Sequence, residues 1–573
     1  MAYDLLIKDG LVVDGTGLAA FRADVGVKGD KIVAIGNLKG AQAGKTINAE
    51  GLIVSPGFVD THTHYDAQFF WDPTGSSSCY QGVTTVVTGN CGFTLAPCRP
   101  DGKEYLLKLF STVEGVPLKS LAAADIQGFP SFPKYLDMLD RPLGVNATAF
   151  VGHSAVRHFV MGEDSYQRTA KPDEIERMKQ LVREAMAAGA IGFASSQGDM
   201  HVGGYGEPVP SRLASQEEIL ELMSAAGEFH CGFNAINQKR APDGSTFHPI
   251  NKTFYPKICQ VAGRPLVWNS LLWRSECPDE YVDILNFMSK ASREQGAAIY
   301  TMFHIQRTDL EFTLKTTAIF DLFPSWRQII HSPHAERLQL LRKPEVRQKM
   351  ATEMAESMKA SLLLRSKSID LATVHHCKLE KNRHLNGVKL TDLATRRGVS
   401  VLDAMLDLAL EEDLDTDFMY WGVRNGNDDE VEKILRHPHV VIGVSDGGAH
   451  VVQECGAMYT SYSLGYWVRE KKALPLEDTI RRLSSVPAAI AGLTDRGVIK
   501  EGMAADLNIF DINTIRPQER VMVNDFPGGS PRLVQKAEGI THTVVNGRVL
   551  VDHGQLTGEL PGTLLRSTRY RGN

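Results

Sequence analysis

The sequence lacks the features that mark several specialised classes of protein. No C-x-x-C pair occurs among its eight scattered cysteines, so we expect reduced thiols in a cytoplasmic protein rather than a disulfide framework. No uncharged run reaches the ~20 residues that a membrane-spanning helix needs. The segment Met1–Asp9 has neither the basic region nor the long apolar region of a secretion signal. We therefore expect a cytoplasmic protein with no membrane partner.

The charge of the chain indicates its class of partner, and its length indicates the number of domains. The net charge is −6 and no basic block stands out, which argues against nucleic acid as the main partner. Hydrophobic residues make up 43% and charged residues 23%, an ordinary enzyme-like composition. At 573 residues the chain exceeds one ordinary core, so we expect two or more domains. Neither an internal repeat nor a low-complexity segment is evident.

The two ends of the chain share a β-rich pattern. Within residues 1–55, short apolar runs alternate with turn signals such as Asp9-Gly10. Near the other end, residues 505–511 alternate between apolar and polar side chains, and residues 543–551 have the pattern of a hairpin. We therefore predict one small β-sandwich domain built from residues 1–55 and 490–573.

The middle of the chain, residues 56–489, alternates apolar strands with amphipathic helices, which is typical of α/β proteins with a parallel sheet or barrel. About eight such units can be counted, as a distorted TIM-type (β/α)8 barrel requires. A stretch at about residues 305–438 interrupts the spacing, and we predict a mostly helical insertion that covers the barrel mouth. The strands predicted after the first one lie at residues 83–88, 146–151, 190–194, 231–236, 266–268, 297–300 and 440–444.

Two histidines follow the first predicted barrel strand. Pro56-Gly57 interrupts an apolar run, Phe58-Val59 resumes it, and His62 and His64 come next. In an extended strand, residues two apart point to the same side, whereas a helix would separate them by about 200°. Both imidazoles can therefore reach one metal ion. The alternative is a pair of histidines in a polar loop, but the apolar strand and the flanking acids favour a metal site.

Asp446 follows the last predicted strand. In a barrel of this type, the catalytic groups come from the C-terminal ends of the strands, and the first and last strands become neighbours when the barrel closes. Three ligands, His62, His64 and Asp446, together with water would form an open catalytic zinc site. Such a metal lowers the pKa of its water and polarises a carbonyl. Asp446 could take the proton of the attacking water and deliver it to the leaving group.

Longer motifs give these residues a family resemblance. The chain resembles the amidohydrolase superfamily and, within it, the N-acyl-D-amino-acid deacylase (D-aminoacylase) family, almost from end to end. The resemblance implies a metal-dependent hydrolase that cleaves an amide bond, with a distorted barrel and a β-sandwich made from both termini. The matching segments are residues 56–64, 82–87, 89–92, 113–117, 152–157, 445–447 and 493–499, with Gly502 and Ala505-Asp506.

The resemblance also implies metal ligands, and this sequence departs from part of that set. His62, His64, Cys91 and Asp446 match family ligands. The family's strand-five histidine motif falls on residues 236–239, which include Asn237, and its strand-six motif falls near residues 269–272.

Two imidazoles are therefore missing, and Leu272 replaces a family lysine. One zinc ion is the simplest expectation, and Cys91 is as easily a small buried residue as a ligand. An amide such as that of Asn237 is a poor zinc ligand.

Three histidines remain as further candidates. His304 or His450 could replace a lost ligand, although each is equally a hydrogen-bonding loop histidine. His153 matches the family's Gly-His at a strand end and is expected to have a structural role or to support the ligands. Arg157, Arg307 and Arg424 are candidates for a guanidinium that would hold a substrate carboxylate.

We predict a metal-dependent hydrolase that cleaves an amide C–N bond, most simply in an N-acyl-amino acid. The same site could instead cleave a lactone, a carbamate or a cyclic amide. A different alternative is a binding protein with a degenerate site, which the missing histidines motivate. The expected partner is a small-molecule substrate, and assembly into a homo-oligomer is left open.

Overall fold

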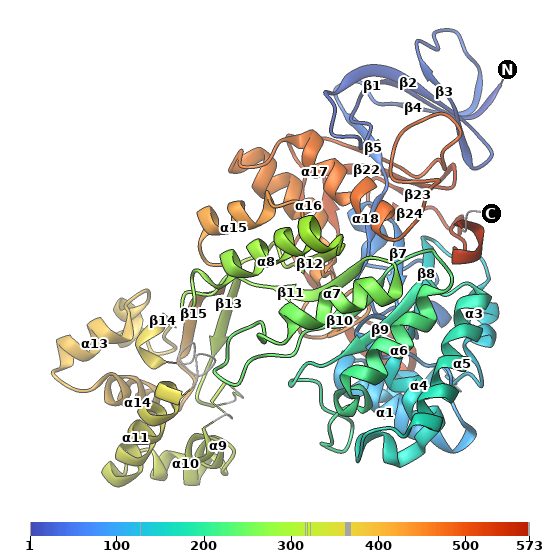
Figure 1. Cartoon of the computed structure of the whole chain (residues 1–573). Helices are drawn as coiled ribbons and strands as arrows, with labels where there is room; N and C mark the ends of the chain where they lie inside the picture. The colour runs from blue at the N-terminus through green and yellow to red at the C-terminus, as the bar shows by residue number, and fades with distance from the viewer. Residues whose placement is uncertain are drawn as a thin grey trace.

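The computed structural model describes residues 2–126, 128–315, 317, 319–320, 323–360 and 368–570. At its centre is an eight-stranded parallel sheet that curls around itself, with helices on its outer side (Figure 1). This sheet agrees with the predicted α/β fold and is consistent with a distorted TIM barrel. In spatial order its strands are β16 (Val440–Ile442), β12 (Ile299–Phe303), β11 (Leu266–Leu271), β10 (Asn234–Asn237), β9 (Gly192–Ser196), β8 (Asn146–Gly152), β7 (Val83–Thr88) and β6 (Phe58–Asp60).

The strands form where the sequence is apolar and β-branched. All six residues of β7 are buried, because side chains on one face fill the barrel and those on the other face meet the surrounding helices. Helix α5 (Pro172–Ala188) buries Met178 and Val182 against the sheet and is followed by Gly189, whose φ is +112°. The other helices that follow barrel strands include α4 (His153–Met161), α6 (Gln216–Gly227), α7 (Asn251–Ala262), α8 (Glu280–Gln295) and α15 (Asp428–Leu435).

The two edges of the curled sheet meet just beyond β6 and β16. Thr63 and Gly447 form an isolated parallel bridge, and the backbone N–H of His64 donates to the carbonyl oxygen of Gly447 at 2.7 Å. The hydroxyl of Ser445 donates to the carbonyl oxygen of His62 at 3.1 Å. These contacts place the His-x-His segment of the first strand beside the segment that carries Asp446.

Strands from both ends of the chain form a second sheet of nine strands. Its order is β24-β23-β22-β17-β5-β1-β2-β3, with β4 paired to β1. The turn expected at Asp9-Gly10 is wrong, because β1 continues through it with a register shift at that point. The sheet mixes the two termini as expected, while the sandwich architecture and the division at residues 1–55 and 490–573 stay predictions. The strands are β1 (Tyr3–Val12), β2 (Phe21–Lys28), β3 (Lys31–Gly36), β4 (Ala43–Asn48), β5 (Ile53–Pro56), β17 (Leu507–Phe510), β22 (Ile540–Val545), β23 (Arg548–Asp552) and β24 (Gln555–Leu556).

The chain between β12 and β16 departs from the predicted, mostly helical insertion. A three-stranded sheet joins its helices, with the strand order β13-β15-β14. The basic segment at residues 337–349 spans two helices, which are separated by a break at residues 341–343. Residues 316, 318, 321–322 and 361–367 of this stretch lie outside the described part. Its elements are β13 (Thr308–Phe312), α9 (Pro324–Ile330), α10 (His334–Leu340), α11 (Pro344–Ala360), β14 (Ala372–His376), α13 (Leu390–Arg397), α14 (Val401–Glu411) and β15 (Asp417–Arg424).

Asn425 joins this insertion to the barrel. Its side chain is buried, and its Nδ2 donates to the carbonyl oxygens of His304, at 2.6 Å, and Gln306, at 3.2 Å. Its Oδ1 accepts from the N–H of Trp273, and its own N–H donates back to the carbonyl oxygen of Trp273. In Figure 1 the insertion helices lie to one side of the barrel, and that they cover its mouth remains a prediction.

Other helices and short strands complete the described chain. No helix in the ranges given above combines the length and apolar character needed to cross a membrane. The remaining elements of four or more residues include α1 (Lys103–Glu114), α2 (Leu118–Ala123), α3 (Phe132–Leu139), α16 (Tyr459–Tyr462), α17 (Leu476–Leu483), α18 (Ser485–Ile490), β19 (Val521–Phe526) and β20 (Ser530–Val534), with short pairing strands β18 (Arg516–Pro517) and β21 (Ala537–Glu538).

Candidate metal centre

A cavity of about 170 Å³ lies at the C-terminal ends of the barrel strands. Its wall includes the four predicted metal-binding residues and three further histidines, which are His62, His64, Cys91, Asp446, His201, His304 and His450. This is the end of a parallel barrel at which strand termini and loops bring polar groups together. The cavity is therefore the candidate functional site.

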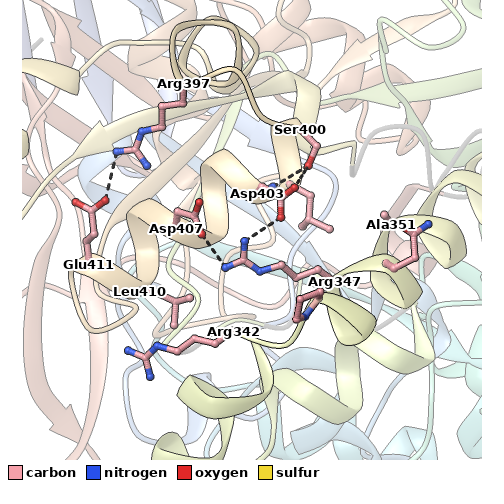
Figure 2. A pocket seen from close by; sticks show the side chains of 12 residues that line it. Arg342, Arg347, Ala351, Arg397, Ser400, Asp403, Asp407, Leu410 and Glu411 are labelled. Atoms are coloured by element: carbon pink, nitrogen blue, oxygen red, sulfur yellow. Dashed lines mark hydrogen bonds and ion pairs between the residues drawn. The ribbon is translucent and has the colours of Figure 1, made fainter.

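A larger hollow, of about 1130 Å³, lies in the insertion between α11 and α14 (Figure 2). Its three acidic groups are all paired with arginines of the same hollow. Arg347 is paired with Asp403 at 2.8 Å and with Asp407 at 2.7 Å, and Arg397 lies 3.6 Å from Glu411. Because these pairs explain the charges without a ligand, volume alone does not make this hollow the functional site.

Two histidines and one aspartate converge in the smaller cavity. The Nε2 atoms of His62 and His64 are 3.2 Å apart. Asp446 Oδ1 lies 3.0 Å from Nε2 of His62 and 3.5 Å from Nε2 of His64. Both histidines are only 2% exposed, so bulk water has little access to their rings. Three groups with lone pairs thus point at one small region.

These separations suit tetrahedral coordination of one metal ion. Zinc–nitrogen and zinc–oxygen bonds of about 2.0–2.1 Å place neighbouring ligand atoms about 3.3–3.4 Å apart, and a thiolate ligand increases the distance to about 3.6 Å. The distances among His62, His64 and Asp446 span 3.0–3.5 Å, and Cys91 Sγ lies 3.7 Å from His62 Nε2. The donor set therefore fits a zinc-like cation.

The protonation states also suit a cation. Burial lowers the pKa of His64 to about 4, so this imidazole is neutral near pH 7. Burial alone would raise the pKa of Asp446, but the contacts with His62 and the hydrogen bond of His64 outweigh it and hold that pKa well below its usual value. A neutral imidazole and an ionised carboxylate are the forms that bind metal.

Cys91 reaches this cluster from the turn after β7. Its φ is +56°, and Gly92 follows with φ +77°, where a Cβ would come within 2.7 Å of the carbonyl oxygen of Ala194. Burial, aided by the charges of Glu114 and Asp446, raises the pKa of Cys91 well above its usual value. Binding of a cation by this thiol would therefore require the loss of a strongly held proton.

The strand-five and strand-six positions carry amides. Asn237 and Asn269 are partners in the register of β10 and β11, and Nδ2 of Asn269 donates to Oδ1 of Asn237 at 3.2 Å. The pair replaces the imidazoles expected from the family resemblance with two neutral groups that bind each other. Asn237 lines the cavity, but its oxygen already has a donor.

Glu114, at the end of α1, touches the cluster from outside. Its Oε2 lies 3.2 Å from Nδ1 of His64, and the residue is 2% exposed. Within the described residues Nδ1 of His64 makes no hydrogen bond, and burial, aided by the charges of Asp446 and Asp66, raises the pKa of Glu114 well above its usual value. An ionised Glu114 that accepted from Nδ1 would keep the proton on that nitrogen and leave the Nε2 lone pair facing the cavity. Glu114 lies within the family motif at residues 113–117, but the sequence assigns it no role, because the pattern of helix α1 does not indicate which strand end the helix approaches.

The remaining histidines lie around this cluster. Burial lowers the pKa of both His201 and His304 to about 4. His201 accepts or donates a 2.6 Å hydrogen bond at Ser196 Oγ, and His450 donates its backbone N–H to the carbonyl oxygen of Glu114. His201 was missed from the sequence, although its position just beyond a strand end is the same signal that identified His304.

His153 belongs to a separate buried network. Its Nε2 is 2.9 Å from Glu218 Oε1, and its Nδ1 is 2.8 Å from Ser195 Oγ. Arg157 pairs with the other oxygen of Glu218, and all three charged or titratable side chains are fully buried. Arg157, considered above as a substrate ligand, is therefore committed to this network.

The other two candidate arginines do not line the cavity, although the charge of Arg424 acts on Arg240 and His304 in its wall. Arg307 pairs with Asp309 at 2.7 Å and faces the ring of Trp421, and Arg424 is exposed. Neither lines the cavity, whereas Arg240, which follows β10, does. Nothing in the spacing of the sequence distinguishes Arg240 from its neighbour Lys239, so geometry was needed to find it.

Known proteins share this fold and length. The amidohydrolase family model matches residues 45–227 and 384–551. A D-aminoacylase from Alcaligenes xylosoxydans xylosoxydans is 29% identical over 572 residues, covering 99% of this chain and 98% of the relative. An N-acyl-D-glutamate deacylase from the same organism is 26% identical over 573 residues, covering 98% of this chain and 96% of the relative.

A solved D-aminoacylase structure with a binuclear metal centre has a TM-score of 0.64 and is 26% identical, covering 98% of this chain and 99% of that chain. The regions matched by the family model contain the first strands of the curled sheet, with His62 and His64, and the segment that holds Asp446. The sheet and this cluster therefore indicate the class of the protein. The chain belongs to the amidohydrolase family. It is a hydrolase that acts on carbon–nitrogen bonds other than peptide bonds.

Proposed function

We propose that this protein is a divalent-metal-dependent deacylase of N-acyl-amino acids, and that His62, His64 and Asp446 bind the metal. The main support is the convergence of their three donor atoms at 3.0–3.5 Å in a cavity at the strand ends. Similarity over nearly the whole chain to a D-aminoacylase and to an N-acyl-D-glutamate deacylase supports the substrate class.

A single zinc ion is the proposed cofactor. Imidazole and carboxylate ligands in a four-coordinate arrangement suit zinc. The paired amides of Asn237 and Asn269 leave Cys91 without imidazole partners for a second ion. The solved D-aminoacylase is described by one-metal activation and second-metal attenuation, which agrees with a one-metal enzyme.

The residues of this chain would share the chemistry as follows. Bound zinc lowers the pKa of water toward neutrality and polarises an amide carbonyl. Asp446 Oδ1 faces the histidines, which leaves its Oδ2 to accept the proton of the attacking water and to return it to the leaving amine. An ionised Glu114 that accepts from Nδ1 of His64 would keep the Nε2 lone pair of this histidine toward the cavity. The amide bond breaks to give a carboxylic acid and a free amine.

Chelation should abolish hydrolysis, and added Zn²⁺ should restore it in the wild type but not in the His62→Ala variant. The expected metal content is close to one ion per chain in the wild type, with a deep loss in the variant because one of three ligands is gone. Elemental analysis and acetate release from N-acetyl-amino acids measure the two quantities. Fully active protein that contains no metal would refute the proposal.

A second histidine cluster supplies the control for adventitious metal. Among the described residues, His542, Asp552 and His553 also bring ligand atoms within 4.8 Å of one another, at β22 and β23 of the nine-stranded sheet. The variant His553→Ala should therefore retain both the activity and the ion bound at the barrel.

A panel of N-acyl D- and L-amino acids, a lactone, a carbamate and a cyclic amide separates deacylation from the alternative reactions. Turnover of none of them by metal-loaded protein would favour a binding protein.

Replacing Glu114 with glutamine should weaken zinc binding by about 10- to 100-fold, the usual effect of removing a carboxylate that supports a ligating histidine. Competition with a chelating dye measures the affinity directly. Asp199→Asn is the matched control, because it removes one negative charge from the same cavity wall without touching His64. Equal losses in the two variants would mean that only the charge of the cavity matters, and not the contact with His64.

A further inference from the structure

Arg240 is the one residue of the cavity wall with a permanent positive charge. Among the described lining residues, no other is an arginine or a lysine. The fixed cation of the site is therefore a guanidinium three residues beyond the end of β10.

This guanidinium has no partner of opposite charge. Within the described residues, no hydrogen bond or ion pair of its side chain is present, and Asp199 on the same wall is not within ion-pair distance. Its neighbour Arg274 is different, since it pairs with Glu280 at 3.3 Å and donates twice to the carbonyl oxygen of Gly244. Unpaired charge on the wall of a cavity is a feature of sites that bind a ligand of opposite charge.

The surroundings of Arg240 make an anion favourable. Partial burial and the positive charges of Arg424 and Arg274 lower the pKa of Arg240 from its ordinary value. The positive charges of these two arginines also favour an anion that approaches the guanidinium.

We propose that Arg240 binds the carboxylate of the substrate and thereby selects acylated amino acids over neutral amides. A planar guanidinium can donate two parallel hydrogen bonds to a carboxylate, which fixes orientation as well as charge. In that position the substrate is held at one end by Arg240 and presents its acyl carbonyl to the region between His62, His64 and Asp446. The inference rests on the proposed deacylase function.

The test compares N-acetyl-leucine with its carboxamide, which has the same shape but no charge. In the Arg240→Met variant, KM for N-acetyl-leucine should rise by about 10- to 100-fold, the effect of losing a hydrogen bond to a charged group, while kcat changes little. KM for the carboxamide should not change. Arg240→Lys should recover part of the loss, since lysine keeps the charge without the planar fork. Lys239→Met removes an equal charge from the adjacent, exposed residue and should alter neither KM.

Two results would overturn the proposal. One is an equal loss with the carboxylate and the carboxamide, and the other is an equal loss in the Arg240→Met and Lys239→Met variants. Calorimetric binding of both compounds to metal-free protein separates this inference from the proposed reaction. A preference for the carboxylate that disappears with Arg240→Met supports the inference even if the wild type hydrolyses neither compound. Absence of that preference in protein that does hydrolyse N-acetyl-leucine refutes it.

Discussion

The Asp446→Asn variant is expected to hydrolyse N-acyl-amino acids with kcat lower by about 10²- to 10⁴-fold, the contribution of a positioned general acid or base. Asparagine has the same shape but cannot accept the proton of water or carry it to the amine. Its neutral oxygen would also leave the cluster of His62 and His64 without a negative charge at 3.0 Å. Steady-state kinetics measure the effect on kcat.

Metal content must be measured in the same samples, because Asp446 has two proposed roles. Activity that returns fully when zinc is saturating would make Asp446 a ligand only. A low kcat with a full complement of zinc supports proton transfer. Asp199→Asn, which alters an acid on the same wall that is not in contact with the histidines, should retain nearly full kcat. Unchanged kcat in Asp446→Asn would exclude its role as proton carrier.

Replacing Glu218 with glutamine should destabilise the fold strongly, by about 3–5 kcal/mol, because the variant leaves the buried guanidinium of Arg157 without its carboxylate. Burial alone would raise the pKa of Glu218, but the hydrogen bond from His153 and the charge of Arg157 outweigh it and lower that pKa, so the native pair is ionised. The loss of stability should appear as a lower midpoint of thermal unfolding.

Glu228→Gln is the matched control for this prediction. Glu228 also pairs with an arginine, Arg183, at 2.8 Å, but its side chain is 47% exposed. Exposed pairs contribute at most about 1 kcal/mol, so this variant should unfold close to the temperature of the wild type. Similar shifts in the two variants would show that the buried network contributes no more than a surface pair.

Local patterns and parallel topology were enough to predict which residues meet in part of the candidate site. The alternation rule for strands placed His62 and His64 on one side, and the closure of a parallel sheet placed Asp446 beside them. Both inferences depend only on the strand to which a residue belongs. For the same reason the eight-stranded sheet could be anticipated from apolar β-branched runs such as Val83–Thr88.

Residues that approach from helices and long loops could not be predicted in this way. Glu114 ends a helix and Arg240 lies in a loop, and periodicity within either segment does not indicate which strand end it meets. The strands of the insertion were missed because β13 pairs with β15, more than 100 residues further along the chain. Pairing over such a distance leaves no local signal in the sequence.

The bridge between Thr63 and Gly447 has a consequence for the biosynthesis of the protein. The proposed ligands come from the two edges of the sheet, and Ser445 reaches His62 across 383 positions of sequence. A nascent chain that has not yet delivered β16 therefore has only the histidine half of the cluster. With the proposed ligands, stable binding of the metal would follow the completion of the barrel and would be a late step of maturation. A truncated or misassembled chain would then differ from a mature one because it fails to retain the ion.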